Sequence, residues 1–589
     1  MKELQYPFDG AYILKNKKKL RRELLEDGSS RVRKNIAVLG GSTTSDIVKC
    51  LELFLLDSGI EPSFYESEYA RYWQDAVFDN ERLSAFSPDL IFIHTSGRNI
   101  DAPPAEMSDS PEKINAMLES ELERYRTMWE SLKNRYACPI IQNNFELPYF
   151  RLLGNRDISD IHGRSRFTAR LNDAFADYAA EHPGFYINDI CYLSACFGLE
   201  KWSDPFYWMM YKYALCVPAI PEFSFNVSNI IKSVFGKNKK VIALDLDNTL
   251  WGGVVGDDGV GGIEIGQETP MGQVYYDFQS YLKRLKGLGI PLTVCSKNDE
   301  ENALAGLRHP DGALKPEDFA LIKANWDAKD INIRATADEI GILPEAIVFM
   351  DDNPAERDIV AKQTNAAVPE ITKPEEYIRV LDRSGFFELT SFSADDARRS
   401  EMYRENAERS RMAASYASYE EYLLGLEMRA QITDFEPISM ERIVQLTNKS
   451  NQFNLTTKRY TLDEMNAVAA NDKYIRLCGR LSDKFGDNGI VSVVAARSEG
   501  NAAHIELWLM SCRVLKRDME LAMLDALAEN AAARGLTELY GYYYPTAKNS
   551  MVKDLYASFG FEKISDEKWR LNLDGYTRKN KVIEVNGRK

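Results

Sequence analysis

The chain has 589 residues and a mass of 67.0 kDa, well beyond the ~250–300 residues at which one hydrophobic core stops growing, so we expect roughly three or four domains. Hydrophobic residues make up 44% and charged residues 28%, which excludes a largely disordered or collagen-like chain. The net charge of −16 opposes non-specific binding to nucleic acid or to an anionic membrane.

The eight cysteines contain no Cys-x-x-Cys pair, so the sequence predicts reduced thiols rather than a disulfide framework or a zinc site. The basic N-terminal run is not followed by the apolar segment of a signal peptide. No run of ~20 apolar residues occurs that would span a bilayer. We therefore expect a cytoplasmic protein whose partners include neither nucleic acid nor a membrane.

Strand-like apolar runs at 36–39, 90–94 and 139–142 are separated by helical stretches such as 110–135. Strands that alternate with helices predict a parallel α/β sheet. We place this first domain at 36–222, after an N-terminal extension, 1–35. A mixed polar segment with a basic cluster follows it and predicts a linker, 223–239.

A second α/β series, placed at 240–385, has apolar runs at 241–244, 290–294 and 346–350, and each run ends at a polar residue. The third segment, 386–589, opens with a charged helix and continues with an amphipathic helix and a hairpin. It ends with a strand at 504–510, a helix at 518–534 and a Tyr-rich strand at 539–544. This order of elements is typical of an α+β domain.

The run 241–244 delivers two carboxylates, Asp245 and Asp247, into a loop at the carboxyl end of a strand, where ligands of parallel sheets bind. The simpler alternative is a strand end with helix-capping aspartates. It is weakened by Ser296, which follows the run 290–294, and by Lys329.

A second pair of acids, Asp351 and Asp352, follows the run 346–350. Four carboxylates gathered in one cleft raise one another's pKa unless a cation is present. Oxygen ligands that leave room for water and phosphate favour Mg²⁺.

With these motifs, residues 240–385 resemble the haloacid dehalogenase (HAD) superfamily. The resemblance implies roles for the polar residues already named: Asp245 as nucleophile on phosphorus, Asp247 as general acid/base, Ser296 as a phosphoryl ligand, Lys329 as its counter-charge, and Asp351 and Asp352 as Mg²⁺ ligands beside Asp245 and the Asp247 carbonyl. The chemistry is self-consistent, because a carboxylate attacks an anionic phosphate only if positive charge offsets the repulsion.

Longer strings narrow the resemblance to the FkbH-like proteins: the run 245–256, Cys-Ser-Lys-Asn-Asp at 295–299, Asn-Gln-Phe-Asn-Leu-Thr-Thr at 451–457, Lys-Phe-Gly-Asp at 484–487 and Ser-Cys-Arg at 511–513. This resemblance implies an α/β multidomain protein with an SGNH-like α/β domain, a HAD-like Rossmannoid α/β domain and a GNAT-like α+β acyltransferase domain. It also implies an enzyme that dephosphorylates 1,3-bisphosphoglycerate and transfers the glyceryl unit to an acyl carrier protein.

The GNAT resemblance places a pyrophosphate-binding loop at 513–518, with Arg513, Lys516 and Arg517 as cofactor-binding residues. Lys516 and Asp518 stand where the family's loop has small residues, mainly glycine. Their side chains crowd the backbone amides, so we expect the phosphopantetheine arm of a carrier protein at least as much as coenzyme A.

Two roles remain open for Cys512. A free cysteine at a strand end is most often a small buried residue. Alternatively, a Cys512 thiolate holds the acyl group as a thioester, its pKa lowered by the basic residues that follow. Cys295 is a weaker rival, because it neighbours Ser296 on a strand and therefore points to the opposite face.

The first domain resembles an SGNH-type esterase, with Gly40-Gly41-Ser42 as the nucleophile block and Gly97-Arg98-Asn99 as the oxyanion block. In the expected place of the general base the chain has Asp204-Pro205-Phe206-Tyr207, and no histidine follows within the domain. We expect this domain to be non-catalytic, because a serine without a base is a poor nucleophile.

The leading hypothesis is therefore a Mg²⁺-dependent HAD-type phosphatase coupled to acyl transfer from a small phosphorylated acyl substrate to a carrier thiol. Its main rival keeps the phosphatase and transfers the acyl group to a small amine, such as an amino sugar. A third hypothesis makes the C-terminal domain a carrier-binding module with vestigial chemistry.

Overall fold

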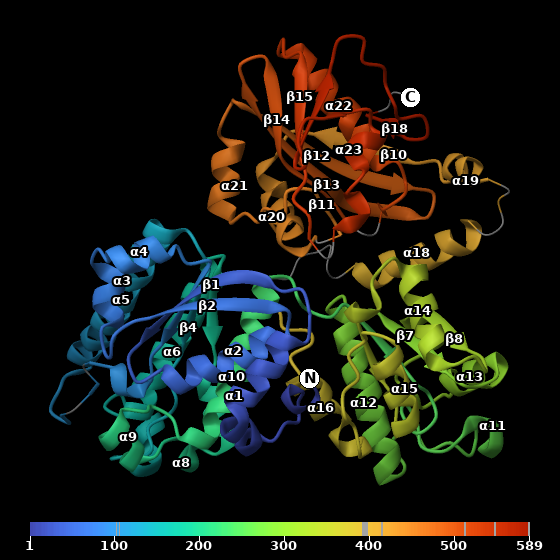
Figure 1. Ribbon diagram of the computed structural model, residues 1–589. Coiled ribbons are helices and arrows are strands. Elements are labelled where there is room, and N and C mark those ends of the chain that lie inside the picture. Colours follow the sequence, from blue (N-terminus) through green and yellow to red (C-terminus); the bar gives the residue numbers. More distant parts are fainter. Residues whose placement is uncertain are drawn as a thin grey trace. The chain divides into compact units, whose positions relative to one another are not determined.

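The computed structural model describes residues 1–101, 103–104, 106–390, 398–413, 416, 418–450, 452–511, 514–546 and 549–586 (Figure 1). The chain divides into two compact units, Met1–Lys237 and Asn238–Lys589, and the second unit contains two separate sheets. Within the described residues, no helix is both long and apolar enough to cross a membrane. The α/β multidomain class is confirmed.

The first unit is built on a five-stranded sheet in the order β2-β1-β3-β4-β5, and all its pairings are parallel. The strands are β1 (Val32–Gly40), β2 (Ile60–Glu66), β3 (Leu90–His94), β4 (Ile140–Asn143) and β5 (Phe185–Asn188). The helices are α1 (Gly10–Glu26), α2 (Ser45–Asp57), α3 (Tyr72–Val77), α4 (Glu81–Phe86), α5 (Pro111–Tyr136), α6 (Arg164–Glu181), α7 (Ile190–Phe197), α8 (Leu199–Trp202), α9 (Pro205–Tyr211) and α10 (Ile220–Val234).

Helices cover both faces of this sheet. Successive residues of a strand point to opposite faces, so each strand packs against helices on both sides. Ile36 and Val38 pack with α1, α2 and α10, whereas Ala37 and Leu39 pack with α3, α5 and α6. A sheet buried on both faces needs continuous apolar runs, and this is the pattern from which the domain was predicted.

Two predicted boundaries of this domain are wrong. The N-terminal extension is part of the fold, because α1 buries Ile13 and Leu20 in the core and β1 begins at Val32. The predicted linker is helical over most of its length, because α10 packs Val227 and Ile231 against α2. These residues recur with helical spacing, a signal that the polar residues between them obscured.

The first sheet of the second unit has four parallel strands in the order β8-β7-β6-β9. They are β6 (Val241–Leu244), β7 (Leu292–Ser296), β8 (Phe319–Ala324) and β9 (Ile347–Met350). The helices are α11 (Val255–Asp258), α12 (Pro270–Gly287), α13 (Glu300–Leu307), α14 (Lys329–Ile340), α15 (Pro354–Gln363) and α16 (Tyr377–Arg383). Since β6 lies between β7 and β9, the loops after these three strands meet at one edge.

The second sheet of this unit has the order β16-β17-β15-β14-β13-β12-β10-β18, and β11 pairs with β14 beside this path. The strands are β10 (Arg429–Thr433), β11 (Phe453–Asn454), β12 (Tyr474–Asp483), β13 (Gly486–Glu499), β14 (Ala502–Met510), β15 (Glu538–Tyr542), β16 (Glu562–Lys563), β17 (Lys568–Asn572) and β18 (Glu584–Val585). The helices are α18 (Arg399–Ala413), α19 (Tyr419–Gly425), α20 (Met440–Lys449), α21 (Leu462–Ala469), α22 (Met519–Ala533) and α23 (Leu555–Ser558).

The pairings of this sheet are antiparallel except that β14 pairs with β15, and β10 with β18, in parallel. The parallel β14–β15 pair is joined by α22, a crossover helix of the kind that parallel strands require. This is the α+β order of elements predicted for the third segment.

Candidate active site

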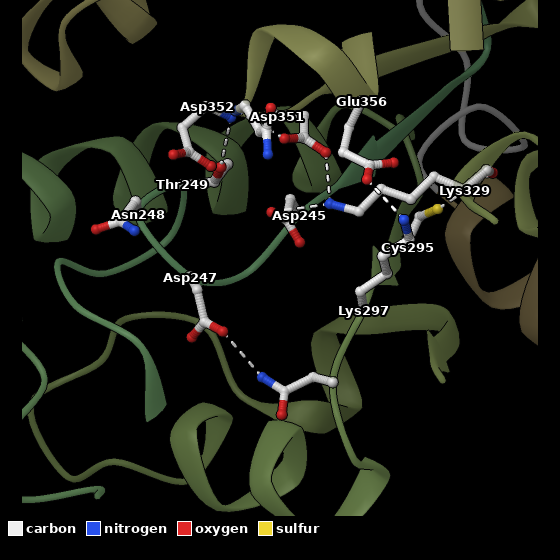
Figure 2. A network of polar contacts seen from close by, with 12 residues as sticks. Asp245, Asp247, Asn248, Thr249, Cys295, Lys297, Lys329, Asp351, Asp352 and Glu356 are labelled. Atoms are coloured by element: carbon white, nitrogen blue, oxygen red, sulfur yellow. Dashed lines mark hydrogen bonds and ion pairs between the residues drawn. The ribbon is translucent and has the colours of Figure 1, made fainter. Parts of the chain in front are cut away.

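The candidate active site lies where the loops after β6, β7 and β9 meet (Figure 2). Asp245 directly follows β6 and is 7% exposed, and its backbone N–H donates to Met350 O at 2.9 Å. Oxygen atoms of Asp245, Asp351 and Asp352 all lie within 4.8 Å of one another. The structure therefore brings together three of the four carboxylates that the sequence singled out.

Lys329 provides the positive charge of this cluster. Its Nζ lies 3.0 Å from Asp245 Oδ2 and 2.5 Å from Asp351 Oδ2, and the residue is 3% exposed. Burial by itself lowers the pKa of a lysine, but Asp245 and Asp351 outweigh it and raise the Lys329 pKa above its ordinary value. The ammonium group is therefore permanently charged and bridges two of the acids.

One lysine does not balance three carboxylates, of which Asp245 and Asp351 are buried and Asp352 is half-buried. Burial raises the pKa of Asp351 and of Asp352, and the charge of Asp245 raises both further. A cation bound by these oxygens would remove that penalty, and an all-oxygen donor set suits Mg²⁺. Asp245, Asp351 and Asp352 are accordingly the side chains that could hold a metal ion.

Two residues without a predicted role position the acids of this cluster. Arg357, in α15, donates to the carbonyl oxygens of Asp351 and Asp352 at 2.7 and 2.8 Å. Thr249 Oγ1 accepts a hydrogen bond from the Asp352 N–H at 3.2 Å. Neither residue stood out in the sequence, because each acts through backbone groups of the loop after β9.

Asp247 is held apart from the acidic cluster. Its Oδ1 accepts hydrogen bonds from Trp251 Nε1 at 2.9 Å and from the Val255 N–H at 3.0 Å, and its Oδ2 accepts one from Asn298 Nδ2 at 3.0 Å. Burial raises its pKa and the Asp245 charge adds to this, although the hydrogen bonds oppose the rise. A carboxyl group with a raised pKa beside a nucleophile suits a general acid.

Asn298 is the polar contact of Asp247 that sequence reasoning missed. It lies two residues beyond Ser296, the last residue of β7, and is 5% exposed. Residues 295–299 are one of the segments that resemble the FkbH-like proteins, but the resemblance assigns no role to this asparagine. Its position two residues past the strand end, on the same loop as Ser296, is the signal that was available.

The two residues at the end of β7 point in opposite directions. Ser296 is 1% exposed and lies at the same sheet edge as Asp245. Cys295 packs on the other face, with its Sγ 3.6 Å from Lys329 O, and burial raises the pKa of its thiol. Cys295 is therefore a protonated buried thiol with little nucleophilic character.

The predicted cofactor loop is described only in part. Cys512 and Arg513 lie outside the described residues. Lys516 is exposed, but Arg517 is buried and donates to Asp483 Oδ2 at 3.2 Å and to Asn406 Oδ1 at 2.8 Å. The prediction for Arg517 is corrected accordingly, because its guanidinium is committed to interior partners.

The positions at which Lys516 and Asp518 replace small residues keep a glycine-like backbone. Their φ angles are 63° and 59°, in the left-handed region that non-glycine residues seldom adopt. The loop before α22 therefore has the backbone shape of a glycine-containing turn although it carries side chains at both positions.

In the first unit, Ser42 follows β1 and is 3% exposed, and no hydrogen-bond partner for its Oγ occurs among the described residues. Asn99 Nδ2 donates to Gly41 O at 3.1 Å, so the two predicted blocks do meet. Asp204 is the N-cap of α9 and accepts a hydrogen bond from the Phe206 N–H at 2.8 Å.

Comparison with known proteins agrees with the class of this site. The chain is similar to the crystal structure of the N-terminal part of BF1531 from Bacteroides fragilis, which contains a phosphatase domain and is complexed with Mg. The identity is 28% and the TM-score 0.59, and the match covers 64% of this chain and 99% of that one. The match supports a HAD-type phosphatase fold for this part of the chain.

Residues 35–232 match the family model described as FkbH, N-terminal domain. The first unit is thus similar to the FkbH N-terminal domain over these residues, in agreement with the resemblance to FkbH-like proteins that the sequence motifs indicated. No curated protein sequence matches the chain.

Acetyltransferases are similar over a smaller part of the chain. The ribosomal-protein-S18-alanine N-acetyltransferase of Escherichia coli is 13% identical with a TM-score of 0.20, and the match covers 24% of this chain and 94% of that one. The Thermoplasma acidophilum PaiA N-acetyltransferase in complex with coenzyme A is 15% identical with a TM-score of 0.20, covering 24% and 99%. At these values the likeness says nothing of activity or ligand.

Proposed function

We propose that this chain is a Mg²⁺-dependent HAD-type phosphohydrolase coupled to acyl transfer, acting on a small phosphorylated acyl substrate and passing the acyl group to the thiol of an acyl carrier protein. The observation that carries the phosphatase part is the contact of Lys329 with both Asp245 and Asp351, with Asp247 held separately at the same edge.

Asp245 acts as the nucleophile. Its carboxylate attacks phosphorus, the bond from phosphorus to the leaving oxygen breaks, and Asp247 donates its proton to that oxygen. Asp247 then takes a proton from water, which attacks the aspartyl phosphate and releases inorganic phosphate. Lys329 offsets the repulsion between the carboxylate and the anionic substrate.

Asp245, Asp351 and Asp352 would hold the Mg²⁺, with the Asp247 carbonyl as a further ligand by family resemblance. When bound, the cation supplies positive charge that stabilises the phosphoryl oxygens. The raised pKa values of Asp351 and Asp352 support a cation here, because burial and, after it, the charge of Asp245 disfavour their ionised forms and a bound cation would offset both.

The acyl part of the proposal rests on the resemblance to FkbH-like proteins, which makes 1,3-bisphosphoglycerate the proposed substrate. Hydrolysis at the Asp245 site would remove its phosphate ester, and the acyl phosphate would remain as the activated group. Cys512 is the proposed carrier of the acyl unit before its transfer to the phosphopantetheine thiol. A thiolate can outcompete water for an activated acyl group at neutral pH.

The phosphatase part is tested by measuring inorganic phosphate released from 1,3-bisphosphoglycerate and from p-nitrophenyl phosphate. Asp245→Asn keeps the size of the side chain and removes its charge, so release should fall on the order of 10⁴-fold or more. Asp257→Asn, an exposed acid of α11, is the matched control and should behave like the wild type. Wild-type turnover in Asp245→Asn or in excess chelator would falsify the assignment.

The acyl part is tested by intact-mass measurement after incubation with 1,3-bisphosphoglycerate, with and without a holo acyl carrier protein. The expected result is an acyl adduct on Cys512 and an acylated carrier, both lost in Cys512→Ser. An adduct that maps to Cys295 or to another cysteine after digestion contradicts the assignment.

A further inference from the structure

A second lysine lies at the acidic cluster and has no part in the reaction described above. Lys297 directly follows Ser296, the last residue of β7, and its Nζ donates to Glu356 Oε1 at 2.7 Å (Figure 2). Glu356 belongs to α15, the helix that follows the loop after β9. The segment 295–299 contributed to the family resemblance, but this lysine received no role from it.

The Lys297–Glu356 pair spans the end of β6. The sheet order is β8-β7-β6-β9, so β6, which leads into Asp245, lies between the strand before Lys297 and the strand before α15. Burial raises the pKa of the Cys295 thiol, and this thiol also feels the charges of Lys329, Asp245, Asp351 and Glu356. Glu356 and the ammonium group that it binds therefore lie beside the acidic cluster.

The backbone that carries Lys297 is held on both sides. On one side, Ser296 O accepts a hydrogen bond from the Asn325 N–H at 3.2 Å. On the other side, Asn298 Nδ2 donates to Asp247 Oδ2 at 3.0 Å. The loop thus places Lys297 before a substrate arrives, which lowers the entropic cost of an interaction with it.

The two lysines of the site differ in how many of their N–H donors are used. The side chain of Lys329 is 4% exposed and contacts two carboxylates. The side chain of Lys297 is 37% exposed, and among the described residues Glu356 Oε1 is its one hydrogen-bond acceptor. An ammonium group has three N–H donors, so Lys297 retains two for a ligand.

Glu356 fixes the position of this ammonium group. The side chain of Glu356 is 14% exposed, and its Oε2 is buried with no hydrogen-bond partner among the described residues. A carboxylate so placed depends on a cation, because burial of an unpaired charge is costly. Lys297 supplies that cation and is held at the sheet edge in return.

We propose that Lys297 is a specificity-determining residue, which binds a second anionic group of the phosphorylated substrate, and that Glu356 is its positioning residue. This inference rests on the proposed function, in which the phosphate ester lies at Asp245 and Lys329. A carboxylate or acyl phosphate on the same small molecule would meet Lys297, and an ionised acceptor forms the stronger hydrogen bond with an ammonium group. A phosphate monoester without a second anion gains nothing from this lysine.

The proposal is tested with two phosphate monoesters that differ in one group. 3-Phosphoglycerate carries a carboxylate where glycerol 3-phosphate carries a hydroxymethyl group. At saturating Mg²⁺, the wild type should release phosphate from 3-phosphoglycerate with a kcat/KM about 10-fold or more above that for glycerol 3-phosphate, the contribution of a hydrogen bond between charged groups. A wild type that does not distinguish the two substrates overturns the proposal.

The test variant removes both charges of the pair. Lys297→Met alone would leave Glu356 buried and unpaired, which is destabilising, so it is combined with Glu356→Gln. The double variant should lose the preference for 3-phosphoglycerate, mainly through a higher KM for that substrate, because the lost contact is made in the ground state too. A double variant that keeps the wild-type preference overturns the assignment.

Three single variants serve as controls. Lys297→Arg keeps the positive charge and Glu356→Gln keeps an acceptor for the lysine, so both should retain the preference. Lys362→Met, which removes an exposed lysine of α15, should retain it as well. Loss of the preference in Lys297→Arg and Lys362→Met alike would show a structural effect and contradict the role of Lys297.

Binding provides a readout that does not need turnover. Calorimetry in an Asp247→Asn background at saturating Mg²⁺ should find that 3-phosphoglycerate binds about 10-fold more tightly than glycerol 3-phosphate, and that the double variant removes this difference. Equal affinities before and after the substitutions overturn the proposal. Phosphate release from p-nitrophenyl phosphate by the wild type reports on the proposed function separately. Its absence refutes the phosphatase, while calorimetry still decides the role of Lys297.

Discussion

Asp245 and Ser42 occupy the same kind of position, each at the carboxyl end of a buried strand in a parallel sheet. Around Asp245, the start of α14 contributes a lysine and the loop after β9 contributes two further acids. Around Ser42, the blocks meet through Asn99 and Gly41, and no partner of the serine Oγ occurs among the described residues.

The difference teaches that the fold provides a place for a site but not its chemistry. A strand end gives access to solvent and to a converging set of loops. The reactivity of the residue there depends on the charges that the adjacent loops supply. A lysine that bridges two carboxylates predicts catalysis in the domain of Asp245. A serine without a base predicts no catalysis in the domain of Ser42.

The largest effect that sharpens this comparison is expected at Asp247. Asp247→Asn should slow phosphate release from an alkyl phosphate by about 10²- to 10⁴-fold, because the leaving oxygen loses its proton donor. The first turnover of p-nitrophenyl phosphate should suffer less, because p-nitrophenolate departs without a proton. Burst kinetics with both substrates measure this, and equal losses on both would contradict a role as general acid.

The next largest loss of phosphatase activity is expected when the positive charge of Lys329 is removed. Lys329→Met should lower phosphate release by about 10²- to 10³-fold, because the charge that offsets the substrate's repulsion is lost. Lys362→Met removes an exposed lysine of α15 as the matched control and should leave the rate unchanged. Steady-state measurement of phosphate release at saturating Mg²⁺ tests this prediction. Similar rates in both variants would rule out the electrostatic role of Lys329.

Magnesium should also stabilise the HAD-like domain. Folding raises the pKa of Asp351 and of Asp352, so each acid holds its proton more tightly in the folded state. In the absence of metal, the free energy of unfolding therefore falls as the pH rises from the unfolded-state pKa through the folded-state pKa. Mg²⁺ at about 100-fold its Kd contributes about 2.7 kcal/mol, or a shift in Tm of about 5 °C or more. Calorimetry should find a larger shift at pH 7.5 than at pH 5, and a shift that grows on acidification would oppose this view.

The smallest effect is expected at Ser42. Ser42→Ala should leave phosphate release and thioester formation unchanged, because the serine has no base to activate it. Short-chain ester hydrolysis should be absent from the wild type and the variant alike. An esterase activity that disappears in Ser42→Ala would show that the two strand ends are more alike than their surroundings indicate.

Much of the acidic site could be predicted from the sequence. Short apolar runs before Asp245, Ser296 and Asp351 identify strands, and the carboxyl ends of parallel strands gather at one edge. Asn298 and Arg357 could not be assigned in this way. Their roles depend on hydrogen bonds across loops, to the Asp247 carboxylate and to backbone carbonyl oxygens.

The helical segments at the edges of the first domain were misjudged for a related reason. The basic residues of α1 and the polar residues of α10 suggested a terminal extension and a linker. Each helix nevertheless has an apolar stripe that packs against α2. The overall composition of a segment does not show such a stripe. The spacing of its apolar residues, three or four apart, does.

The sequence by itself indicated the alternation of strands and helices in the two α/β domains, the residues at the strand ends and the residue types of the acidic cluster, because these follow from local apolar patterns and residue types. Only the tertiary structure decided that Arg517 is turned inward, that Lys516 and Asp518 adopt left-handed backbone, and that Lys297 meets Glu356 across the end of β6. These features depend on contacts between residues far apart in the chain, and no local pattern encodes a contact whose partner is chosen by packing.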